Sequence, residues 1–142
     1  MSATPFSYSL TIREAHLDTF GHVNNATYLS LFEEARWELV TQRGYGLDQV
    51  RSRQHGPIIL DVHLEFRKEL KLREKVLITT KLLHYEKRVG QLYQEIVAES
   101  SPDLVFAKAT FTFGLFDLKA RRLIPPTDAW LYAIGAKDSL LK

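Results

Sequence analysis

The chain has 142 residues, of which 45% are hydrophobic, 25% charged and 11% aromatic, and its formal net charge is +2. This length suits one domain with a full core, and the composition excludes a disordered or fibrous protein. The absence of cysteine excludes disulfides, thiolate nucleophiles and cysteine-ligated metals, and the small charge gives no reason to expect nucleic acid. Without a signal-peptide pattern or an apolar run of about 18 residues, we expect one cytoplasmic domain over residues 1–142, with no membrane partner.

The N-terminal third predicts a strand, a polar turn and a long helix. Residues 6–13 alternate apolar and polar side chains, which is the period of a half-buried strand. A polar segment, DTFGHVNN, follows at residues 18–25. Asn24 or Asn25 is a suitable N-cap for a helix that runs to about Arg43, where Gly44 and Gly46 favour its end. Its apolar residues cover more than one stripe, so we expect a helix wrapped by other elements.

The rest of the chain predicts strands and one short helix. A strand from Ile58 to about Arg67 places Ile58, Leu60, Val62, Leu64 and Phe66 on one face. A polar connection at 68–75 leads to further strands at 75–86, 89–100 and 104–117. Turns are expected at 101–103 and at 87–90, where Gly90 tolerates a positive φ, and a C-terminal helix from near Thr127. Strands grouped after one long helix favour an α+β fold, in which a five-stranded antiparallel sheet wraps around a central helix.

The polar turn holds the residues with the most chemistry. Asp18 supplies a carboxylate, and the predicted helix begins a few residues later. A helix start carries unpaired N–H groups and a partial positive charge, which suit a carboxylate, a phosphate or a developing oxyanion. Aspartate is also common in turns for structural reasons alone, so the residues by themselves leave both roles of Asp18 open.

These elements resemble the hotdog fold, and the residues resemble acyl-CoA thioesterases of the 4-hydroxybenzoyl-CoA type. The similarity rests on the Asp18–Asn25 segment, on Tyr28-Leu29, and on Glu33 or Glu34 with Ala35-Arg36. A weaker similarity covers 107–117, Arg122 and Ile124-Pro125. The resemblance implies hydrolysis of acyl-CoA, without a metal or redox cofactor, by a homodimer or homotetramer whose sites lie at the subunit interface. One residue departs from the family pattern, because His16 stands where many relatives carry a second Asp.

In such an enzyme Asp18 acts as nucleophile or as general base, and the sequence does not separate the two. Backbone N–H groups at Asn24, Asn25 and Ala26 are expected to form the oxyanion hole. His22 and Asn25 are candidates for positioning the thioester or water, although they equally suit a turn held by hydrogen bonds.

Substrate-binding residues are expected outside this segment. Lys87 with Arg88, or Arg121 with Arg122, suit the phosphates of CoA, and His63 with Glu65 suit the partner's site in a dimer, although solvated surface positions explain them too. Phe20, Tyr28, Phe32 and Ile59 fit either an acyl tunnel or the core. Two other functions remain: an acyl-CoA-binding module without catalysis, and a thioesterase for acyl-carrier protein. A hotdog dehydratase is disfavoured because no His lies between Asn24 and Arg43.

Overall fold

The computed structural model describes residues 6–136 and contains one antiparallel sheet and three α-helices within that range. The elements are β1 (Phe6–Thr11), a 3-10 turn η1 (Glu14–His16), α1 (Asn25–Gln42), α2 (Leu47–Arg53), β2 (His55–Phe66), β3 (Lys75–Glu86), β4 (Val89–Ala98), β5 (Ser101–Asp117), β6 (Arg122–Ile124) and α3 (Asp128–Ala133). The predicted α+β class is confirmed. No helix in residues 6–136 is long and apolar enough to cross a membrane.

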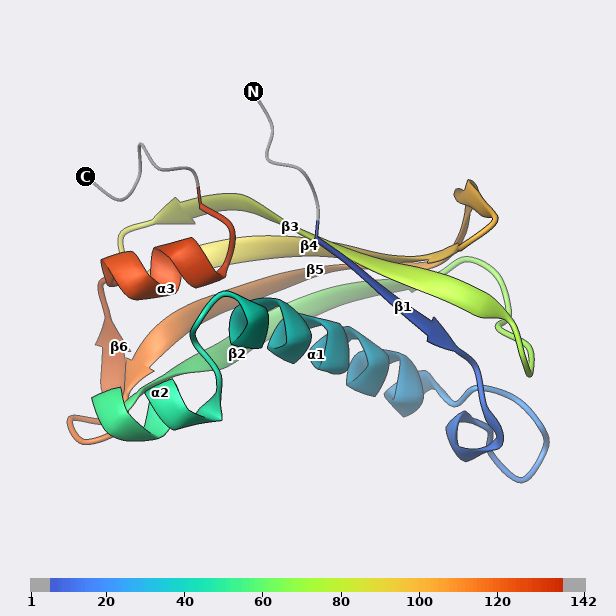
Figure 1. Cartoon of the computed structure of the whole chain (residues 1–142), viewed down its shortest axis with the longest axis horizontal. Helices are drawn as coiled ribbons and strands as arrows, with labels where there is room; N and C mark the ends of the chain where they lie inside the picture. Colours follow the sequence, from blue (N-terminus) through green and yellow to red (C-terminus); the bar gives the residue numbers. More distant parts are fainter. Residues whose placement is uncertain (1–5, 137–142) are drawn as a thin grey trace.

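The strands run in the order β1-β3-β4-β5-β2, and β6 pairs with the end of β5. The sheet therefore has six strands, not the predicted five. The sequence prediction missed β6 because it has only three residues beside a Pro-Pro turn. Figure 1 shows α1 lying along one face of this sheet, with α2 and α3 near the C-terminal end of α1. The N-terminal end of α1 lies beside η1, at the opposite end of the molecule.

The long helix buries one broad face against the sheet. Its start is fixed by Asn24, whose side chain accepts a hydrogen bond from the Ala26 N–H, as predicted for an N-cap. Its buried residues recur at the helical spacing of three and four, and Phe32 is 0% exposed and packs edge-on against Phe111 of β5 at 5.8 Å. Full burial of such a side chain contributes about 1.5–3 kcal/mol. Leu29 and Glu33 lie on the exposed side, so the sheet covers one face and does not surround the helix.

One polar network crosses the apolar interface between α1 and the sheet. Gln94 of β4 is 0% exposed; its amide group donates to the Phe32 carbonyl at 3.1 Å and to Thr80 Oγ1 at 2.9 Å. Its carbonyl oxygen accepts from the Arg36 guanidinium at 3.0 Å, and that guanidinium lies 4.2 Å from the centre of the Phe111 ring. Burial lowers the pKa of Arg36 to about 10, so it stays charged at neutral pH.

A β-bulge divides the edge strand β2. Ile59 pairs with Phe113 and Asp61 with Thr112, so Leu60 is an extra residue on β2. Ile59 faces α1 before the bulge, and Val62 and Leu64 face it afterwards. The predicted inward face is therefore wrong for Ile58 and Leu60, because one extra residue reverses the alternation.

Two predicted turns differ from those observed. Residues 101–103 belong to β5, and the turn lies at Glu99 and Ser100. At the predicted 87–90 turn, Lys87 rather than Gly90 has the positive φ, at 56°. Gly90 is required for a different reason: a Cβ there would lie 2.8 Å from both Phe113 and Tyr85 side-chain atoms.

The C-terminal helix α3 closes one end of the core. It begins at Asp128, near Thr127 as predicted, and Thr127 caps it by accepting a hydrogen bond from the Trp130 N–H at 3.2 Å. Trp130 is 2% exposed and packs edge-on against Tyr45 at 5.2 Å and Phe113 at 6.1 Å. These contacts join α3 to the segment after α1 and to the sheet.

Replacing Gln94 with Met should destabilise the fold by about 2–4 kcal/mol, because it leaves the Phe32 carbonyl and the Arg36 guanidinium buried without their partner. Urea unfolding followed by circular dichroism measures the loss. The matched control is Gln91→Met on the same strand, where the side chain is only partly buried and about 1 kcal/mol or less is expected. An Arg36→Met, Gln94→Met double variant should recover part of the loss. Equal effects of Gln94→Met and Gln91→Met would contradict the structural role of this network.

Candidate active site

The polar turn between η1 and α1 is closed by Asp18. One oxygen of its carboxylate, Oδ1, accepts from the backbone N–H of Phe20 at 2.9 Å and from that of His22 at 3.1 Å. The Asp18 N–H donates to the His22 carbonyl at 2.8 Å, and Leu17 and Val23 form an isolated antiparallel bridge. Asp18 therefore braces the turn. Its second oxygen, Oδ2, has no hydrogen-bond partner in the described part of the chain, and the residue is exposed.

At the helix start beside this turn, one of the three backbone N–H groups predicted for the oxyanion hole is not free. The Ala26 N–H donates to the Asn24 side chain at 2.7 Å, and the Thr27 and Tyr28 N–H groups donate to the Asn24 carbonyl. The Ala26 N–H, predicted as part of the oxyanion hole, is therefore already bonded to the Asn24 cap. The backbone N–H groups of Asn24 and Asn25 have no partner among the described residues, and both residues are exposed.

A hollow of about 450 Å³ lies between the turn, the first turn of α1 and the loop after β2. It is lined by His22, Val23, Asn25, Tyr28, Phe66, Arg67, Lys68 and Glu69. His22 Nε2 lies 3.2 Å from Glu69 Oε1, and the Tyr28 ring packs edge-on against Phe66 at 5.0 Å. The structure thus places His22 and Asn25 at one hollow, whereas Asp18 is not among the residues that line it.

Sequence reasoning missed the contribution of the loop after β2. Residues 68–75 are mostly charged, which predicts a polar connection. The structure places Lys68 and Glu69 at the rim of the hollow, beside His22. The only signal in the sequence was their position directly after an edge strand, which does not show their approach to the turn at His22.

His16 has a structural place within the turn. Its Nδ1 accepts from the Arg13 N–H at 2.9 Å and so closes η1. An ion pair between Glu14 and Arg73, at 2.7 Å, holds η1 against the loop before β3. Among residues 6–136, no group of three or more His, Asp or Glu side chains is arranged to hold a metal ion.

The predicted CoA-binding residues lie far from Asp18 within one chain. Lys87 and Arg88 are at the tip of β3–β4, where the Arg88 carbonyl lies beside Gly114. The hollow is at the other end of β5, because Phe66 pairs with Ala107. Seven residues of extended strand separate these two ends of β5, a distance of about 23 Å.

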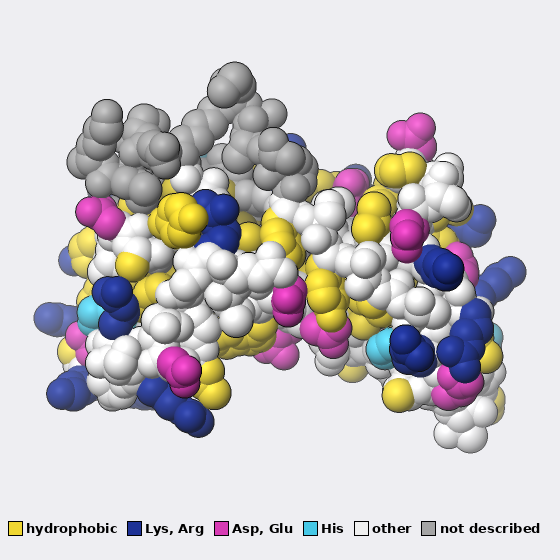
Figure 2. Space-filling model, viewed as in Figure 1, with side chains coloured by type: hydrophobic (Ala, Val, Ile, Leu, Met, Phe, Trp, Pro, Cys, Tyr) yellow, Lys and Arg dark blue, Asp and Glu magenta, His cyan; other side chains and the backbone are white. Residues whose placement is uncertain are grey.

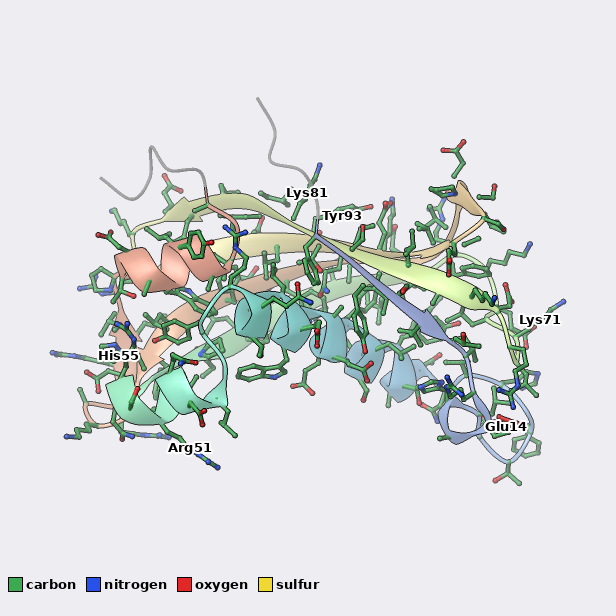
Figure 3. The ribbon with its side chains drawn as sticks, viewed as in Figure 1. Glu14, Arg51, His55, Lys71, Lys81 and Tyr93 are labelled. Carbon is green, nitrogen blue, oxygen red and sulfur yellow. The ribbon has the colours of Figure 1, made fainter. Side chains whose placement is uncertain are left out.

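Arg121 and Arg122 are also distant from Asp18, whereas His63 lies on β2 three residues before Phe66, which lines the hollow. Arg122 pairs with Asp117, next to His55 and so at the same end as Lys87. Figure 3 shows His55 and Arg51 at one end and Glu14 and Lys71 at the other, and Figure 2 shows Lys and Arg side chains gathered at both ends of this face. His63, on β2, is 79% exposed in its side chain and lies 3.8 Å from Glu65.

A long helix on an antiparallel sheet, with a braced carboxylate and free amides at its N-terminal end, defines the class of hotdog-fold thioesterases. The comparison with known families agrees: the thioesterase-like superfamily matches residues 12–134, and the chain belongs to this family. The predicted fold and enzyme class are therefore confirmed.

Individual relatives agree with this assignment. The long-chain acyl-CoA thioesterase FadM of Escherichia coli is 30% identical over 115 residues, which is 81% of this chain and 86% of that protein. The crystal structure of the probable thioesterase YbaW from Escherichia coli superimposes with a TM-score of 0.74 at 29% identity, covering 84% of this chain and 88% of that one. The protein SAV2348 of Staphylococcus aureus, solved in complex with CoA, shares the fold with a TM-score of 0.83 at 15% identity, covering 96% and 89% of the two chains.

Replacing Asp18 with Ala should destabilise the protein by about 1 kcal/mol, because two backbone N–H groups lose their acceptor. Asp18→Asn keeps an Oδ1 acceptor and should cost less than half as much. Thermal unfolding compares the two variants with the wild type, and a shift of about 2–4 °C per kcal/mol is expected for a domain of this size. A loss for Asn as large as that for Ala would show that the charge, and not the acceptor geometry, holds the turn.

Proposed function

We propose that this protein hydrolyses acyl-CoA thioesters to the free acid and CoA, with Asp18 as the catalytic carboxylate. The observation that carries the proposal is the geometry of Asp18: two backbone bonds fix Oδ1, and Oδ2 is left free in an exposed turn next to an open helix start. Membership of the thioesterase-like superfamily supports it. The names of the FadM relative and of the CoA-bound Staphylococcus aureus structure are consistent with this choice of substrate.

Hydrolysis requires attack at the thioester carbon and stabilisation of the oxygen that becomes negative. In one route Asp18 Oδ2 attacks the carbon and releases the CoA thiolate, and water then hydrolyses the mixed anhydride to the free acid and the Asp18 carboxylate. In the other, Oδ2 takes a proton from a water that attacks the carbon, and the CoA thiolate leaves as the free acid forms. The Asn25 N–H is the donor we propose for the oxyanion, assisted by the partial positive charge of the start of α1. His22, held by Glu69, and the Asn25 side chain position the thioester or water.

The substrate's phosphates require cations near the hollow. Arg67 and Lys68 line it within one chain. A two-fold axis that pairs two β2 strands places the end of one sheet that carries Lys87 and Arg88 beside the end of the partner sheet that carries the hollow. Lys87 and Arg88 would therefore reach the hollow from a second subunit. His63, exposed on β2, would then face the partner's site, as the sequence suggested.

We propose that the protein forms a homodimer through β2. This strand is at the edge of the sheet, has 12 residues and exposes Ile59, Leu60, Val62 and Phe66 by 39–47%. A long edge strand with exposed apolar side chains invites pairing with another strand unless something covers it. The residues described leave the outer edge of β2 unpaired. A tetramer of two such dimers remains the alternative assembly.

Asp18→Asn should reduce acyl-CoA hydrolysis by about 10²–10⁴-fold, because the amide cannot act as base or as an effective nucleophile. Activity on aliphatic and aromatic acyl-CoAs is measured by thiol release, with binding to a CoA thioether measured in parallel. Retained binding with lost turnover is expected. Equal turnover by the variant and the wild type would remove Asp18 from catalysis. Binding without turnover by the wild type would instead identify a binding module, and turnover confined to acyl-carrier protein would identify the other substrate.

Leu60→Lys should convert the dimer to monomer, because it places a charge beside the proposed β2 interface without altering any side chain that lines the hollow. Analytical ultracentrifugation measures the change. Leu83→Lys is the matched control, since Leu83 is 44% exposed on β3, away from the edge of β2, and should leave the mass unchanged. A wild-type monomer, or an unchanged dimer in Leu60→Lys, would contradict assembly through this edge.

A further inference from the structure

Three histidines of the described chain lie near a carboxylate, and the pair of His22 and Glu69 is the closest. Its Nε2 and Oε1 atoms are 3.2 Å apart, against 3.8 Å for the pair at His63 and 3.9 Å for the pair at His55. Of these pairs, His22 and Glu69 alone line the hollow of the candidate site. A histidine held by a carboxylate at such a place suits proton transfer or the positioning of a reactant.

The backbones of both residues are anchored. The His22 N–H donates to Asp18 Oδ1 at 3.1 Å, and the His22 carbonyl accepts from the Asp18 N–H at 2.8 Å. Glu69 precedes Leu70, which is 1% exposed and packs in the core. The two side chains are 61% and 54% exposed, and so open a pair adds little to stability. Its consequence is the orientation of the imidazole.

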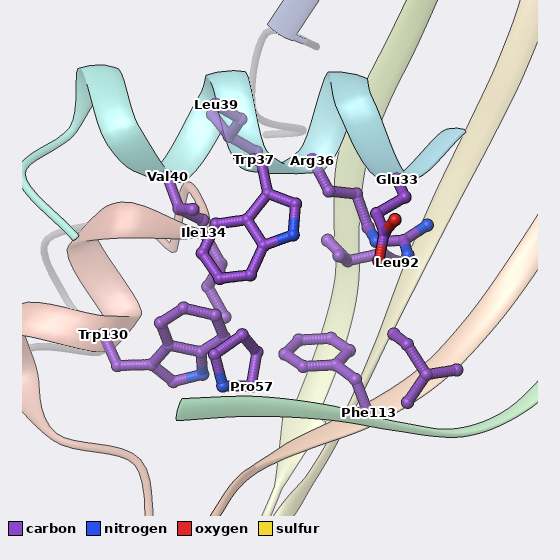
Figure 4. Close-up of a pocket in the computed structure, with 11 residues that line it drawn as sticks. Glu33, Arg36, Trp37, Leu39, Val40, Pro57, Leu92, Phe113, Trp130 and Ile134 are labelled. Atoms are coloured by element: carbon purple, nitrogen blue, oxygen red, sulfur yellow. The ribbon is translucent and has the colours of Figure 1, made fainter. Parts of the chain in front are cut away.

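A second cavity, of about 80 Å³, lies at the C-terminal end of α1 and has no comparable pair. Figure 4 shows Trp37 projecting from α1 towards Trp130 of α3 in this cavity. Its charged lining residues are Glu33, which is exposed, and Arg36, whose guanidinium is bonded to Gln94. Of the two cavities, only the one at the candidate site therefore has a histidine.

The contact with Glu69 determines which ring nitrogen of His22 carries the proton. An ionised carboxylate only accepts hydrogen bonds, so Nε2 is the donor. In the neutral imidazole the other nitrogen, Nδ1, is then an acceptor. Nδ1 has no hydrogen-bond partner within residues 6–136. The hollow is therefore presented with a free acceptor.

A free acceptor suits water and does not suit the thioester. The oxygen and sulfur of a thioester offer lone pairs, which an acceptor nitrogen cannot bind. A water molecule can donate one hydrogen to Nδ1 and still attack with its oxygen. The thioester oxygen instead requires donors, which the side-chain amide and the backbone N–H of Asn25 can supply.

We infer that Glu69 is a positioning residue, which holds the His22 imidazole so that Nδ1 receives a hydrogen bond from the attacking water. The inference rests on the proposed function for its reaction, and it narrows the role of His22 from thioester or water to water.

Each route of hydrolysis uses this acceptor differently. In the anhydride route, Nδ1 takes a proton from the water while the water oxygen bonds to the acyl carbon and the Asp18 carboxylate leaves. The imidazolium then gives that proton to the CoA thiolate. In the other route, Asp18 Oδ2 takes one proton of the water, and Nδ1 accepts a hydrogen bond from its second hydrogen.

A double-mutant cycle on kcat tests whether Glu69 acts through His22. The substrate is the acyl-CoA that the wild type hydrolyses fastest. His22→Phe removes both ring nitrogens and should lower kcat by about 10²-fold. Glu69→Leu should lower kcat by about tenfold, because the imidazole is present but no longer held, and should have no further effect in the His22→Phe background. Glu69→Gln keeps an acceptor for Nε2 and should retain most of the activity.

Glu14→Leu is the matched control. Glu14 also joins the N-terminal segment to the loop after β2, through Arg73 at 2.7 Å, but it does not line the hollow. Its kcat should equal that of the wild type. Equal losses in Glu14→Leu and Glu69→Leu would show that attachment of the loop matters and would overturn the inference. Losses of His22→Phe and Glu69→Leu that add in the double variant would overturn it too.

Binding of a carbonyl analogue separates water from thioester without turnover. In this probe a CH₂ group replaces the thioester sulfur of acyl-CoA, so the carbonyl stays and hydrolysis is blocked. Isothermal titration calorimetry should give Kd values for His22→Phe and Glu69→Leu within about twofold of the wild type. A Kd raised about tenfold or more in His22→Phe would place the imidazole on the thioester and overturn the assignment to water.

The outcomes separate this inference from the proposed function. Hydrolysis that depends on Asp18 but is unchanged in Glu69→Leu would overturn the positioning role and leave the thioesterase intact. Loss in Glu69→Leu that disappears in the His22→Phe background, with full activity in Asp18→Asn, would support Glu69 and remove Asp18. A wild type without hydrolysis would overturn both. Thermal unfolding identifies a variant that fails to fold, and Glu69→Lys, which cannot accept from Nε2 either, then replaces Glu69→Leu.

Discussion

The packing of α1 on the sheet is the interaction on which the rest of the structure depends. Phe32 and its neighbours supply the apolar contact, while Gln94 joins a helix carbonyl and the Arg36 guanidinium to the middle of β4. A buried amide with three partners tolerates little sliding, since any shift leaves polar groups without hydrogen bonds. The helix is thus fixed against sliding along its axis as well as in its distance from the sheet. The Asn25 amide at one end of α1 and the cavity at its other end are fixed with it.

Much of the fold followed from local patterns. The Asn24 cap and the start of a helix near Thr127 depend on neighbouring residues, and the structure confirms both. The misplaced features depend on partners distant in sequence. β6 exists because it pairs with Leu115–Asp117, and Gly90 is needed because Phe113 packs over it. Periodicity within a segment carries no information about either contact.

The same distinction applies to the candidate site. The turn at Asp18 was predictable because its hydrogen bonds span only a few residues. Glu69 and Lys68 were missed because their approach to His22 requires the whole sheet to be in place. Ala26 was assigned to the oxyanion although the Asn24 cap, itself predicted, uses its N–H. A side-chain cap at Asn24 requires a backbone N–H two or three residues later as its donor. The predicted cap therefore already implied that the Ala26 N–H is not free to bind an oxyanion.

Because Leu60 is an extra residue, odd-numbered residues of β2 face α1 before the bulge and even-numbered residues face it afterwards. Ile59 lies opposite Phe113 and Asp61 lies opposite Thr112, so deleting Leu60 would close the bulge and leave Pro57 and Ile59 on the face towards α1. The strand can therefore lose this one residue without changing which side chains face the helix. Related sequences can differ in length at this position and keep the same wall.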